Sequence, residues 1–298
     1  MTDITLLDGS IGQEIVKRSG SRATPLWSTS VMMEQPDVVR AVHLDYFNRG
    51  ATIATTNSYA VWPDRLERVG LADEHLRLLD TAAAEAVAAR ATHGSGRIAA
   101  SLGPLGASYR PDIAVPLDEA ATAYRINMER LAPSADLFLI ETVSSLHAAR
   151  GALMGCTGAD KPVWLAVTVD DDDGTKLRSG ESVSNLAQLV KDFAPAALLV
   201  NCSRPEAIAA ALDLIAPIGL PFGAYANGFT RISEGFLKDA PTVDALEQRK
   251  DLGPKDYAQF AMHWIAQGAT IVGGCCEVGP DHIAELATQL KAAGHTIT

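Results

Sequence analysis

The chain has 298 residues, of which 47% are hydrophobic and 20% charged, and its formal net charge is −11. This apolar content is enough for a sizeable core, and the charge is too low for a disordered chain. An excess of carboxylates has the wrong sign for binding phosphate backbones or anionic lipid, so we exclude nucleic acid and membrane surfaces as partners. The length suits a single α/β barrel domain over residues 1–298, because such barrels typically need about 250 residues.

The cysteines favour metal binding or catalysis over a disulfide framework. The first ten residues, MTDITLLDGS, do not resemble a secretory signal, and no stretch approaches the roughly 18 apolar residues that span a bilayer. We therefore expect a cytoplasmic protein, in which thiols stay reduced. Four cysteines are too few for a disulfide scaffold, and two of them, Cys275 and Cys276, are adjacent. Such thiols indicate metal binding or catalysis.

Short runs rich in Val, Ile and Leu recur along the chain, and each is typical of a buried strand. The eight predicted strands are Ile4 to Leu7, Thr52 to Thr56, Arg97 to Leu102, Leu137 to Ile140, Val163 to Val169, Ala197 to Val200, Phe222 to Ala226 and Thr270 to Gly273.

Helical segments separate these strands and carry recognisable start signals. Pro36 begins one that ends before Gly50, and Pro280 begins the last. A Ser cap at Ser203, an early Pro205 and a Glu three residues after the cap begin another.

Two Ala- and Leu-rich stretches, Asp73 to Arg90 and Ala207 to Ala216, are also predicted helices. Eight βα units without a linker predict one closed (β/α)8 TIM barrel, in the α/β class. The first strand is followed by Asp8-Gly9-Ser10, which is no phosphate-binding glycine turn, so a dinucleotide-binding sheet is not favoured. The acidic run Asp170 to Asp173 is interpreted as a solvated loop.

Polar residues collect directly after the predicted strands, where function lies in this fold. They are Asp8-Gly9-Ser10, Asn57-Ser58-Tyr59, Gly103-Pro104, Glu141-Thr142, Asn201-Cys202-Ser203 and Gly274-Cys275-Cys276.

Three of these residues are cysteines that the barrel should bring together, since only one strand separates the sixth from the eighth. Three thiolates without an obvious fourth protein ligand are typical of an open zinc site, whereas structural zinc closes its tetrahedron. Gly273 and Gly274 allow the chain to bend, so that both Cys275 and Cys276 can face one ion. We therefore predict Zn²⁺ on Cys202, Cys275 and Cys276. Cys156, at the end of a predicted helix, receives no role.

The ordered motifs resemble the homocysteine S-methyltransferase family, which includes the betaine and S-methylmethionine enzymes, over essentially the whole chain. The matching segments are Leu6-Leu7-Asp8-Gly9, Pro25-Leu26-Trp27-Ser28, His43 through Gly50, Thr56-Asn57-Ser58-Tyr59, Ser101-Leu102-Gly103-Pro104, Glu141-Thr142, Asn201-Cys202, Gly273-Gly274-Cys275-Cys276, Pro280 and His282-Ile283.

The resemblance implies a catalytic zinc on three cysteines and methyl transfer to homocysteine, giving methionine. It also implies that Asp8 and Glu141 hold the amino group of homocysteine. Two departures concern the rim of the site. Ser10 stands where the family usually has a second Gly beside Gly9, which changes how backbone N–H groups receive a carboxylate. Glu277-Val278-Gly279 follows the cysteine pair, where Thr-rich or Arg-containing variants are commoner.

The expected chemistry needs a thiolate acceptor and a cationic methyl donor. A free thiol has a pKa near 8.5, and coordination to zinc deprotonates it. The leaving group departs neutral, so no catalytic His is required, and His43 and His75 are assigned to packing or surface roles. Aromatic faces suit an onium donor, which makes Trp27 and Tyr59 candidates, and Asn57 is placed in the same substrate site. Asn201 is expected to brace the zinc loop.

The sequence leaves the donor open, with S-methylmethionine ahead of S-adenosylmethionine, betaine and dimethylsulfoniopropionate. A second hypothesis is a zinc methyltransferase whose acceptor is not homocysteine but selenocysteine or another small thiol. A zinc- or redox-sensing protein without turnover is a third, and an alkylating role beside a separate cobalamin protein is a fourth. The expected partners are small-molecule substrates, and the sequence does not decide whether the protein forms a homo-oligomer.

Overall fold

The strands form because runs of branched apolar residues are buried on both faces of a parallel sheet. The computed structural model describes residues 2–20, 26–232 and 246–298, so Pro25 of the predicted motif lies outside the described residues. The eight strands of the barrel are β1 (Asp3–Leu6), β2 (Ile53–Thr55), β3 (Arg97–Leu102), β4 (Leu137–Val143), β5 (Val163–Val167), β6 (Ala197–Asn201), β7 (Phe222–Tyr225) and β8 (Ile271–Val272).

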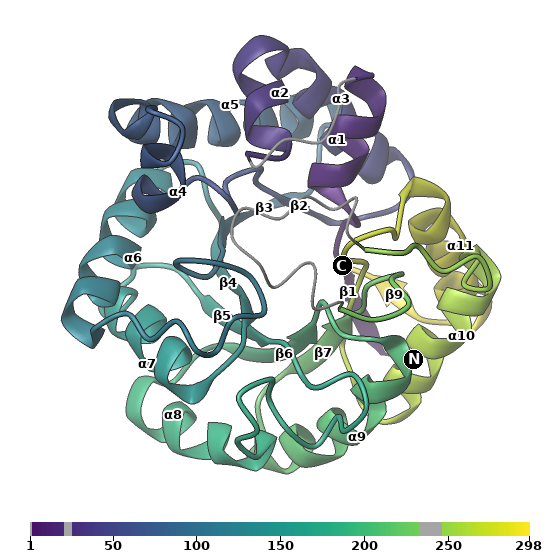
Figure 1. Ribbon diagram of the computed structural model, residues 1–298. Coiled ribbons are helices and arrows are strands. Elements are labelled where there is room, and N and C mark those ends of the chain that lie inside the picture. Colours follow the sequence, from purple (N-terminus) through teal and green to yellow (C-terminus); the bar gives the residue numbers. More distant parts are fainter. Residues whose placement is uncertain (1, 21–25, 233–245) are drawn as a thin grey trace.

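The strands pair side by side in chain order, all parallel, and β8 returns to β1. A bridge between Leu7 and Ile53 joins the end of β1 to β2 and closes the ring. Figure 1 shows the view along the ring, with the helices around it. The predicted (β/α)8 barrel is confirmed.

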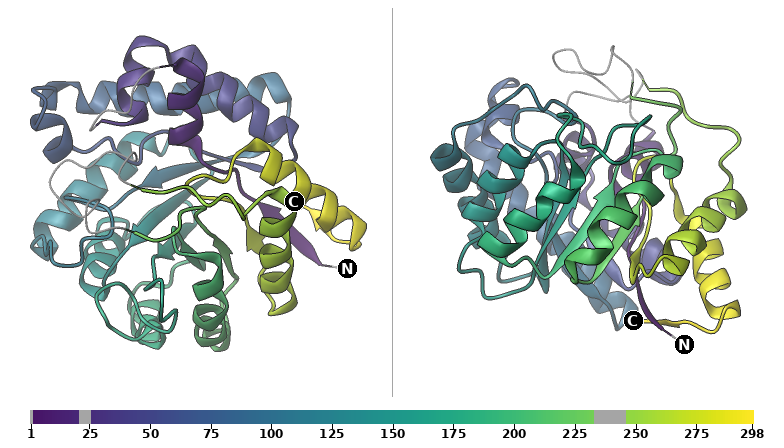
Figure 2. Two further views of the ribbon diagram at one scale, coloured as in Figure 1. Left: turned by 45° about the vertical axis from the view of Figure 1, so that its right-hand side comes forward. Right: turned by 90° about the horizontal axis from the view of Figure 1, so that it is seen from below.

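Helices cover the outside of the sheet, as the turned views show (Figure 2). Several begin at a proline in the first turn, where its missing N–H costs nothing. The helices are α1 (Ile11–Ser19), α2 (Ser28–Glu34), α3 (Pro36–Asn48), α4 (Pro63–Glu67), α5 (His75–His93), α6 (Leu117–Leu131), α7 (Leu146–Gly155), α8 (Leu186–Phe193), α9 (Pro205–Ile215), α10 (Pro254–Ala266) and α11 (Pro280–Ala292). Within the described part of the chain, no helix is long and apolar enough to cross a membrane.

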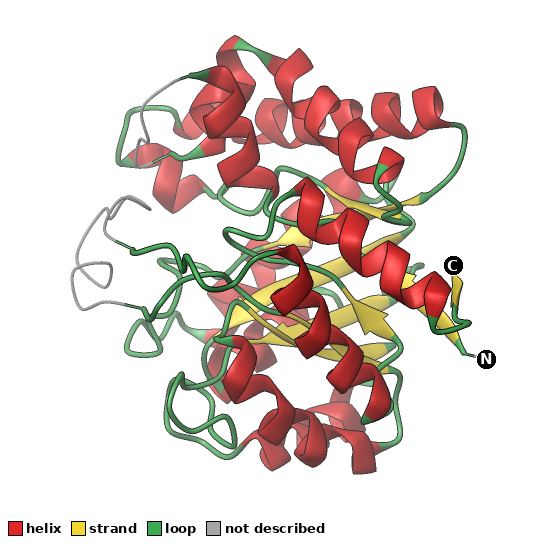
Figure 3. Cartoon of the chain, turned by 90° about the vertical axis from the view of Figure 1, so that its right-hand side faces the viewer, coloured by secondary structure: helices red, strands yellow, loops and turns green. Residues whose placement is uncertain are grey.

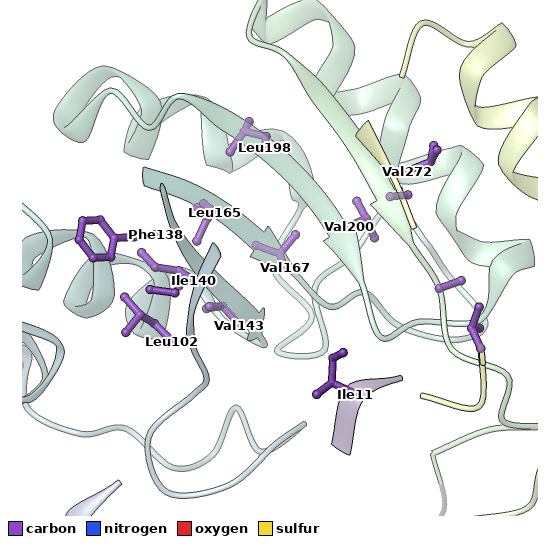
Figure 4. Packing of buried hydrophobic residues seen from close by; sticks show 14 of the residues in the cluster. Ile11, Leu102, Phe138, Ile140, Val143, Leu165, Val167, Leu198, Val200 and Val272 are labelled. Atoms are coloured by element: carbon purple, nitrogen blue, oxygen red, sulfur yellow. The ribbon is translucent and has the colours of Figure 1, made fainter. Parts of the chain in front are cut away.

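Side chains alternate between two cores because successive strand residues point to opposite faces. In β4, Leu137 and Leu139 belong to the cluster inside the barrel. Phe138 and Ile140 belong to the larger cluster between the sheet and the helices (Figure 4). This double burial makes the barrel a rigid support for the loops at its carboxyl end.

The structure differs from the prediction at two local points. Ser203 does not cap α9: Arg204 takes the cap position, and the Ser203 hydroxyl instead accepts the Val169 N–H at 2.9 Å. A short additional strand, β9 (Thr296–Ile297), pairs with the start of β1 and was not predicted. Both chain ends therefore lie at the same end of the molecule (Figure 3).

Candidate active site

A pocket opens at the carboxyl ends of the strands and contains the predicted site residues. Its volume is about 830 Å³ including the open mouth, and residues in or after seven different strands contribute to its wall. The lining includes Asp8, Gly9, Ser10, Trp27, Asn57, Tyr59, Glu141, Cys202, Cys275 and Cys276. The barrel thus brings together every residue that the sequence assigned to the site.

Three cysteine sulfurs meet at this mouth. Cys202 directly follows β6, and Cys275 and Cys276 follow β8, with β7 between the two strands. Their sulfur atoms all lie within 4.8 Å of one another, close enough to hold one metal ion. Cys202 has a φ of 46°, an uncommon value for a residue with a side chain. Surrounding contacts must therefore hold this residue.

Two of the sulfurs form a disulfide in this structure. Cys202 and Cys275 are bonded, whereas Cys276 is free. The sequence predicted that these cysteines, 73 residues apart, come together, but as three thiols and not as a disulfide, because thiols were expected to stay reduced in a cytoplasmic protein. The oxidised pair shows that the two cysteines approach closely, and reduction is required before all three can act as thiolate ligands.

The glycines before the cysteine pair permit close packing. A side chain on Gly273 would lie 2.5 Å from Cβ of Leu7, and one on Gly274 would lie 2.2 Å from Val278. Neither glycine has a positive φ. Their function is therefore to let the β8 loop approach β1, in addition to the bend that the sequence suggested.

Asp8 lies at the end of β1 and faces the pocket with 3% of its surface exposed. Its carboxylate accepts hydrogen bonds from the Thr55 N–H at 2.6 Å and the Thr55 hydroxyl at 2.8 Å. Burial nevertheless raises the pKa of Asp8 well above its usual value, and the nearby Glu141 adds to this effect. A cationic ligand would relieve both costs.

Glu141 lies inside β4, where the sequence had placed it just beyond the strand. The register of β4 against β5 shifts between Ile140 and Val143, and Thr142 has a φ of 57°. This irregularity turns Glu141 into the pocket, as bulges commonly do beside active sites. Asn201 stabilises this irregular part of β4 through two hydrogen bonds with Thr142, of 3.0 and 2.9 Å. Asn201, which directly precedes Cys202 in the chain, therefore also braces β4.

Two hydroxyl groups bind the Glu141 carboxylate. Ser101 donates to one oxygen at 2.5 Å, and Tyr225 donates to the other at 3.0 Å. Burial raises the pKa of Glu141 to about 7, although both hydrogen bonds act in the opposite direction. Asp8 and Glu141 thus form a pair of enclosed carboxyl groups without a basic partner among their described contacts. Such a pair is suited to an ammonium group.

Aromatic rings form part of the pocket wall. Trp27 and Tyr59 are stacked, with ring centroids 6.4 Å apart. The Tyr59 hydroxyl bonds to that of Ser108 at 2.7 Å. Tyr109 was missed by sequence reasoning, although it packs against Cys202 in the same cluster as Trp27. No motif marks Tyr109, because a loop after β3 carries it across the barrel mouth.

The other predicted residues have well-defined surroundings. Asn57 accepts a hydrogen bond from Ser28 at 2.6 Å, so its oxygen is already engaged. The Ser10 hydroxyl donates to Gln13 at 2.7 Å, and Gln13 also donates to Glu277 at 2.5 Å. Ser10 and Glu277, the two departures from the family pattern, are therefore linked through one glutamine that the sequence did not single out.

The acidic run after β5 is only partly solvated, contrary to the prediction. Asp172 is 69% exposed, but the side chain of Asp171 is only 8% exposed and pairs with Arg178. An exposed acidic loop therefore contains one enclosed carboxylate, next to the Cys202 loop.

Comparison with known proteins agrees with this site. Residues 5–290 match the family described as homocysteine S-methyltransferase. The homocysteine S-methyltransferase of Escherichia coli K12 is 29% identical over 309 residues, which cover 95% of this chain and 94% of the relative. The selenocysteine methyltransferase of Astragalus bisulcatus is 27% identical over 317 residues, which cover 93% and 90%.

Solved structures give the same result. The metallated form of the Escherichia coli homocysteine methyltransferase MmuM has a TM-score of 0.82 and 27% identity, and the match covers 97% of this chain and 96% of that one. Its oxidized form gives a TM-score of 0.80 with the same identity and coverage. With a family match over nearly the whole length, the chain belongs to the homocysteine S-methyltransferase family of enzymes.

Proposed function

We propose that this enzyme transfers a methyl group from an onium donor to the sulfur of L-homocysteine, giving methionine, with zinc held by Cys202, Cys275 and Cys276. The observation that carries the proposal is the convergence of three sulfurs, within 4.8 Å of one another, beside two enclosed carboxyl groups in one pocket. The similarity to a solved structure of MmuM in its metallated form supports a metal in this enzyme.

The three sulfurs fit zinc by their chemistry and number. Thiolates are soft ligands that favour Zn²⁺, and three protein ligands leave the fourth position for substrate. When bound, the ion would supply the charge that keeps the homocysteine sulfur deprotonated and nucleophilic. Burial raises the pKa of the free Cys276 thiol to about 12, so this residue stays protonated without a nearby cation.

Asp8 and Glu141 are proposed to bind the ammonium group of homocysteine. Both face the same pocket and lack a basic partner among their described contacts. The ammonium would favour their ionised forms and would be held by two charge-assisted hydrogen bonds. Ser101 and Tyr225 orient Glu141 for this contact. Binding at this point fixes the amino acid so that its sulfur reaches the cysteine cluster.

The donor is proposed to lie against the rings of Trp27, Tyr59 and Tyr109. A desolvated cation over aromatic faces gains about 0.5 to 2 kcal/mol. The homocysteine sulfur forms a bond to the methyl carbon while the bond from that carbon to the onium atom breaks. The electron pair of the broken bond stays on the leaving group, which departs neutral without a proton. S-Methylmethionine is the leading donor, ahead of S-adenosylmethionine, betaine and dimethylsulfoniopropionate.

Selenocysteine is a second candidate acceptor, since a selenocysteine methyltransferase is 27% identical to this chain. Selenocysteine has the same α-ammonium group as homocysteine, and this group would bind to the same two carboxylates. A competition assay with homocysteine separates the two acceptors by their relative kcat/KM.

The experiment that tests the proposal measures zinc content and methionine formation with a panel of the four donors. We expect one zinc per reduced chain, and activity that a chelator abolishes. In Cys202→Ala and Cys276→Ala, zinc binding and activity should both be lost. Cys156→Ala is the matched control, because Cys156 is buried at the end of α7, outside the cluster. Full zinc occupancy with undiminished activity in either cluster variant contradicts the proposal.

A further inference from the structure

An enclosed ion pair lies beside the Cys202 loop and has no role in the chemistry above. Arg178 and Asp171 both belong to the segment between β5 and α8, and their side chains are 2.9 Å apart. These side chains are only 11% and 8% exposed, which makes this the most enclosed ion pair among the described residues. Removing such a pair from water costs free energy, which further hydrogen bonds to both side chains must offset.

Asp171 connects its own loop to two others. One carboxylate oxygen accepts the N–H of Arg204 at 3.4 Å, and the other accepts the N–H of Ile232 at 3.1 Å. Arg204 comes two residues after Cys202, and Ile232 packs against the cluster formed by Tyr109 and Cys202. One side chain therefore links the loops that follow β5, β6 and β7.

Arg178 reaches the backbone of Cys202 itself. Its Nε donates to the Thr168 hydroxyl at 2.9 Å, and that hydroxyl donates to the Cys202 carbonyl at 3.1 Å. One terminal nitrogen of Arg178 also approaches this carbonyl at 3.5 Å. The guanidinium carbon lies 4.8 Å from the centre of the Tyr109 ring.

The two residues that Arg178 contacts in this way have strained backbones. Cys202 has a φ of 46° and Tyr109 a φ of 61°, values that residues with side chains adopt only where their surroundings fix them. Both face the pocket. The ion pair thus acts at two of the strained residues in the pocket wall.

We propose that Arg178 and Asp171 are positioning residues, which hold Cys202 in the orientation that the metal requires and hold the Tyr109 ring against the donor. The inference rests on the proposed function, because it assumes that Cys202 is a metal ligand. Partners behind the ligands commonly set metal affinity, and their loss typically costs 10- to 100-fold. Since Asp171 neutralises Arg178, the pair supplies hydrogen bonds without a net positive charge that would repel a cationic donor.

The test uses Asp171→Asn and Arg178→Met in the full, reduced chain. We expect zinc affinity, measured by competition with a chelator, to fall about 10- to 100-fold. The absorption bands of the Co²⁺-loaded protein, which report thiolate geometry, should shift. The KM for the donor should rise more than the KM for homocysteine, because Tyr109 loses its support while Asp8 and Glu141 keep theirs.

Two control variants separate positioning from general effects. Asp172→Asn removes an exposed carboxylate of the same loop. Arg150→Met removes a surface arginine that pairs with Asp192 at 2.8 Å and lies 5.5 Å from the Phe193 ring, a similar arrangement outside the pocket of the three clustered cysteines. Both controls should bind zinc like the unmodified protein.

A milder variant keeps the inference testable if removal of the ion pair prevents folding. Thr168→Val keeps Arg178 and Asp171 but removes the hydroxyl that donates to the Cys202 carbonyl, and it should also weaken zinc binding and shift the Co²⁺ spectrum. Unchanged zinc affinity and spectrum in every folded variant, with normal metal binding by the unmodified chain, overturn the inference. If the unmodified chain binds no metal, the proposed function itself fails.

Discussion

The ionised form of Glu141 opposes folding, and it is also the form that we propose binds the ammonium group of homocysteine. Its pKa in the folded protein is about 7, against an ordinary value of 4.5. The folded chain therefore holds this proton more tightly than the unfolded chain. The resulting stability is fully present below about pH 4.5 and is lost as the pH rises to about 7. One pKa unit corresponds to about 1.4 kcal/mol, so the effect is on the order of 3 kcal/mol.

We therefore predict that Glu141→Gln stabilises the substrate-free protein while impairing catalysis. The free energy of unfolding should rise by about 1 to 3 kcal/mol at pH 8 and change much less at pH 5, because the glutamine cannot ionise. The KM for homocysteine should rise at least about tenfold, as a charged partner of its ammonium is lost. Denaturant unfolding at the two pH values, with steady-state kinetics, measures both effects.

Glu129→Gln, on the exposed surface of α6, is the control and should change neither quantity. An equal gain in stability at pH 5 and pH 8 for Glu141→Gln would show that its charge is not the cause.

The disulfide between Cys202 and Cys275 predicts that the redox state decides metal binding. The oxidised protein should bind at most weakly to zinc, since two of its three sulfurs are bonded to each other. Treatment with a thiol reductant should restore stoichiometric binding and activity. Zinc titration before and after reduction, with thiol counting as a check, measures this. Stoichiometric binding to the oxidised form contradicts the three-sulfur site.

At the scale of residues, the sequence predicted most of the site, and the exceptions have one cause. Asp8, Glu141 and the three clustered cysteines lie at or near strand ends, so counting strands is enough to bring them together. Tyr109 and Asp171 were missed as contributors, because long loops carry them over the barrel mouth. Where a loop crosses depends on tertiary contacts, which no local pattern records.

Among the elements, the loops after β1 and β8 are in close contact. A side chain on Gly9 would lie 2.1 Å from the Val278 carbonyl oxygen and 2.9 Å from the Tyr46 ring. The Ser10 N–H donates to the same carbonyl at 3.0 Å. The cysteine pair is thus fixed to the loop that carries Asp8.

We predict that Gly9→Ala forces these two loops apart. Overpacking of this kind typically costs about 1 to 3 kcal/mol of folding stability, and zinc affinity should fall with it. Gly253→Ala is the control, because its new carbon would lie at an ordinary 3.5 Å from Asp256. Thermal unfolding and zinc titration of both variants check the prediction. A stable Gly9→Ala protein with normal zinc affinity contradicts it.

The predicted elements agree with the structure in their order and differ mainly at their ends. β3 has the predicted bounds, Arg97–Leu102, because its apolar run starts and stops sharply. β4 runs on to Val143, since the sheet accommodates Glu141 and Thr142 by an irregular register. β9 has only two residues and depends on β1, so its own sequence carries no strand signal.

For the whole molecule, closure of the barrel is what makes the site. Asp8, Glu141, Cys202 and the cysteine pair come from four strands, and only a closed ring lets all four face one pocket. The alternation of strands and helices was sufficient to predict this closure. The position of the methyl donor could not be predicted, because it depends on the loops above the ring.

The pairing of β9 with β1 places the two chain ends side by side, opposite the pocket. The Thr296 N–H donates to the Thr2 carbonyl at 3.2 Å. A short Gly/Ser linker should therefore splice the ends, and a new opening between the exposed Gly94 and Ser95 should yield a circular permutant. We expect it to keep zinc affinity and kcat within a few-fold, and loss of the fold by circular dichroism would contradict this. Either end can likewise serve as an anchoring point for a fused module or a solid support while substrates enter freely from the far side.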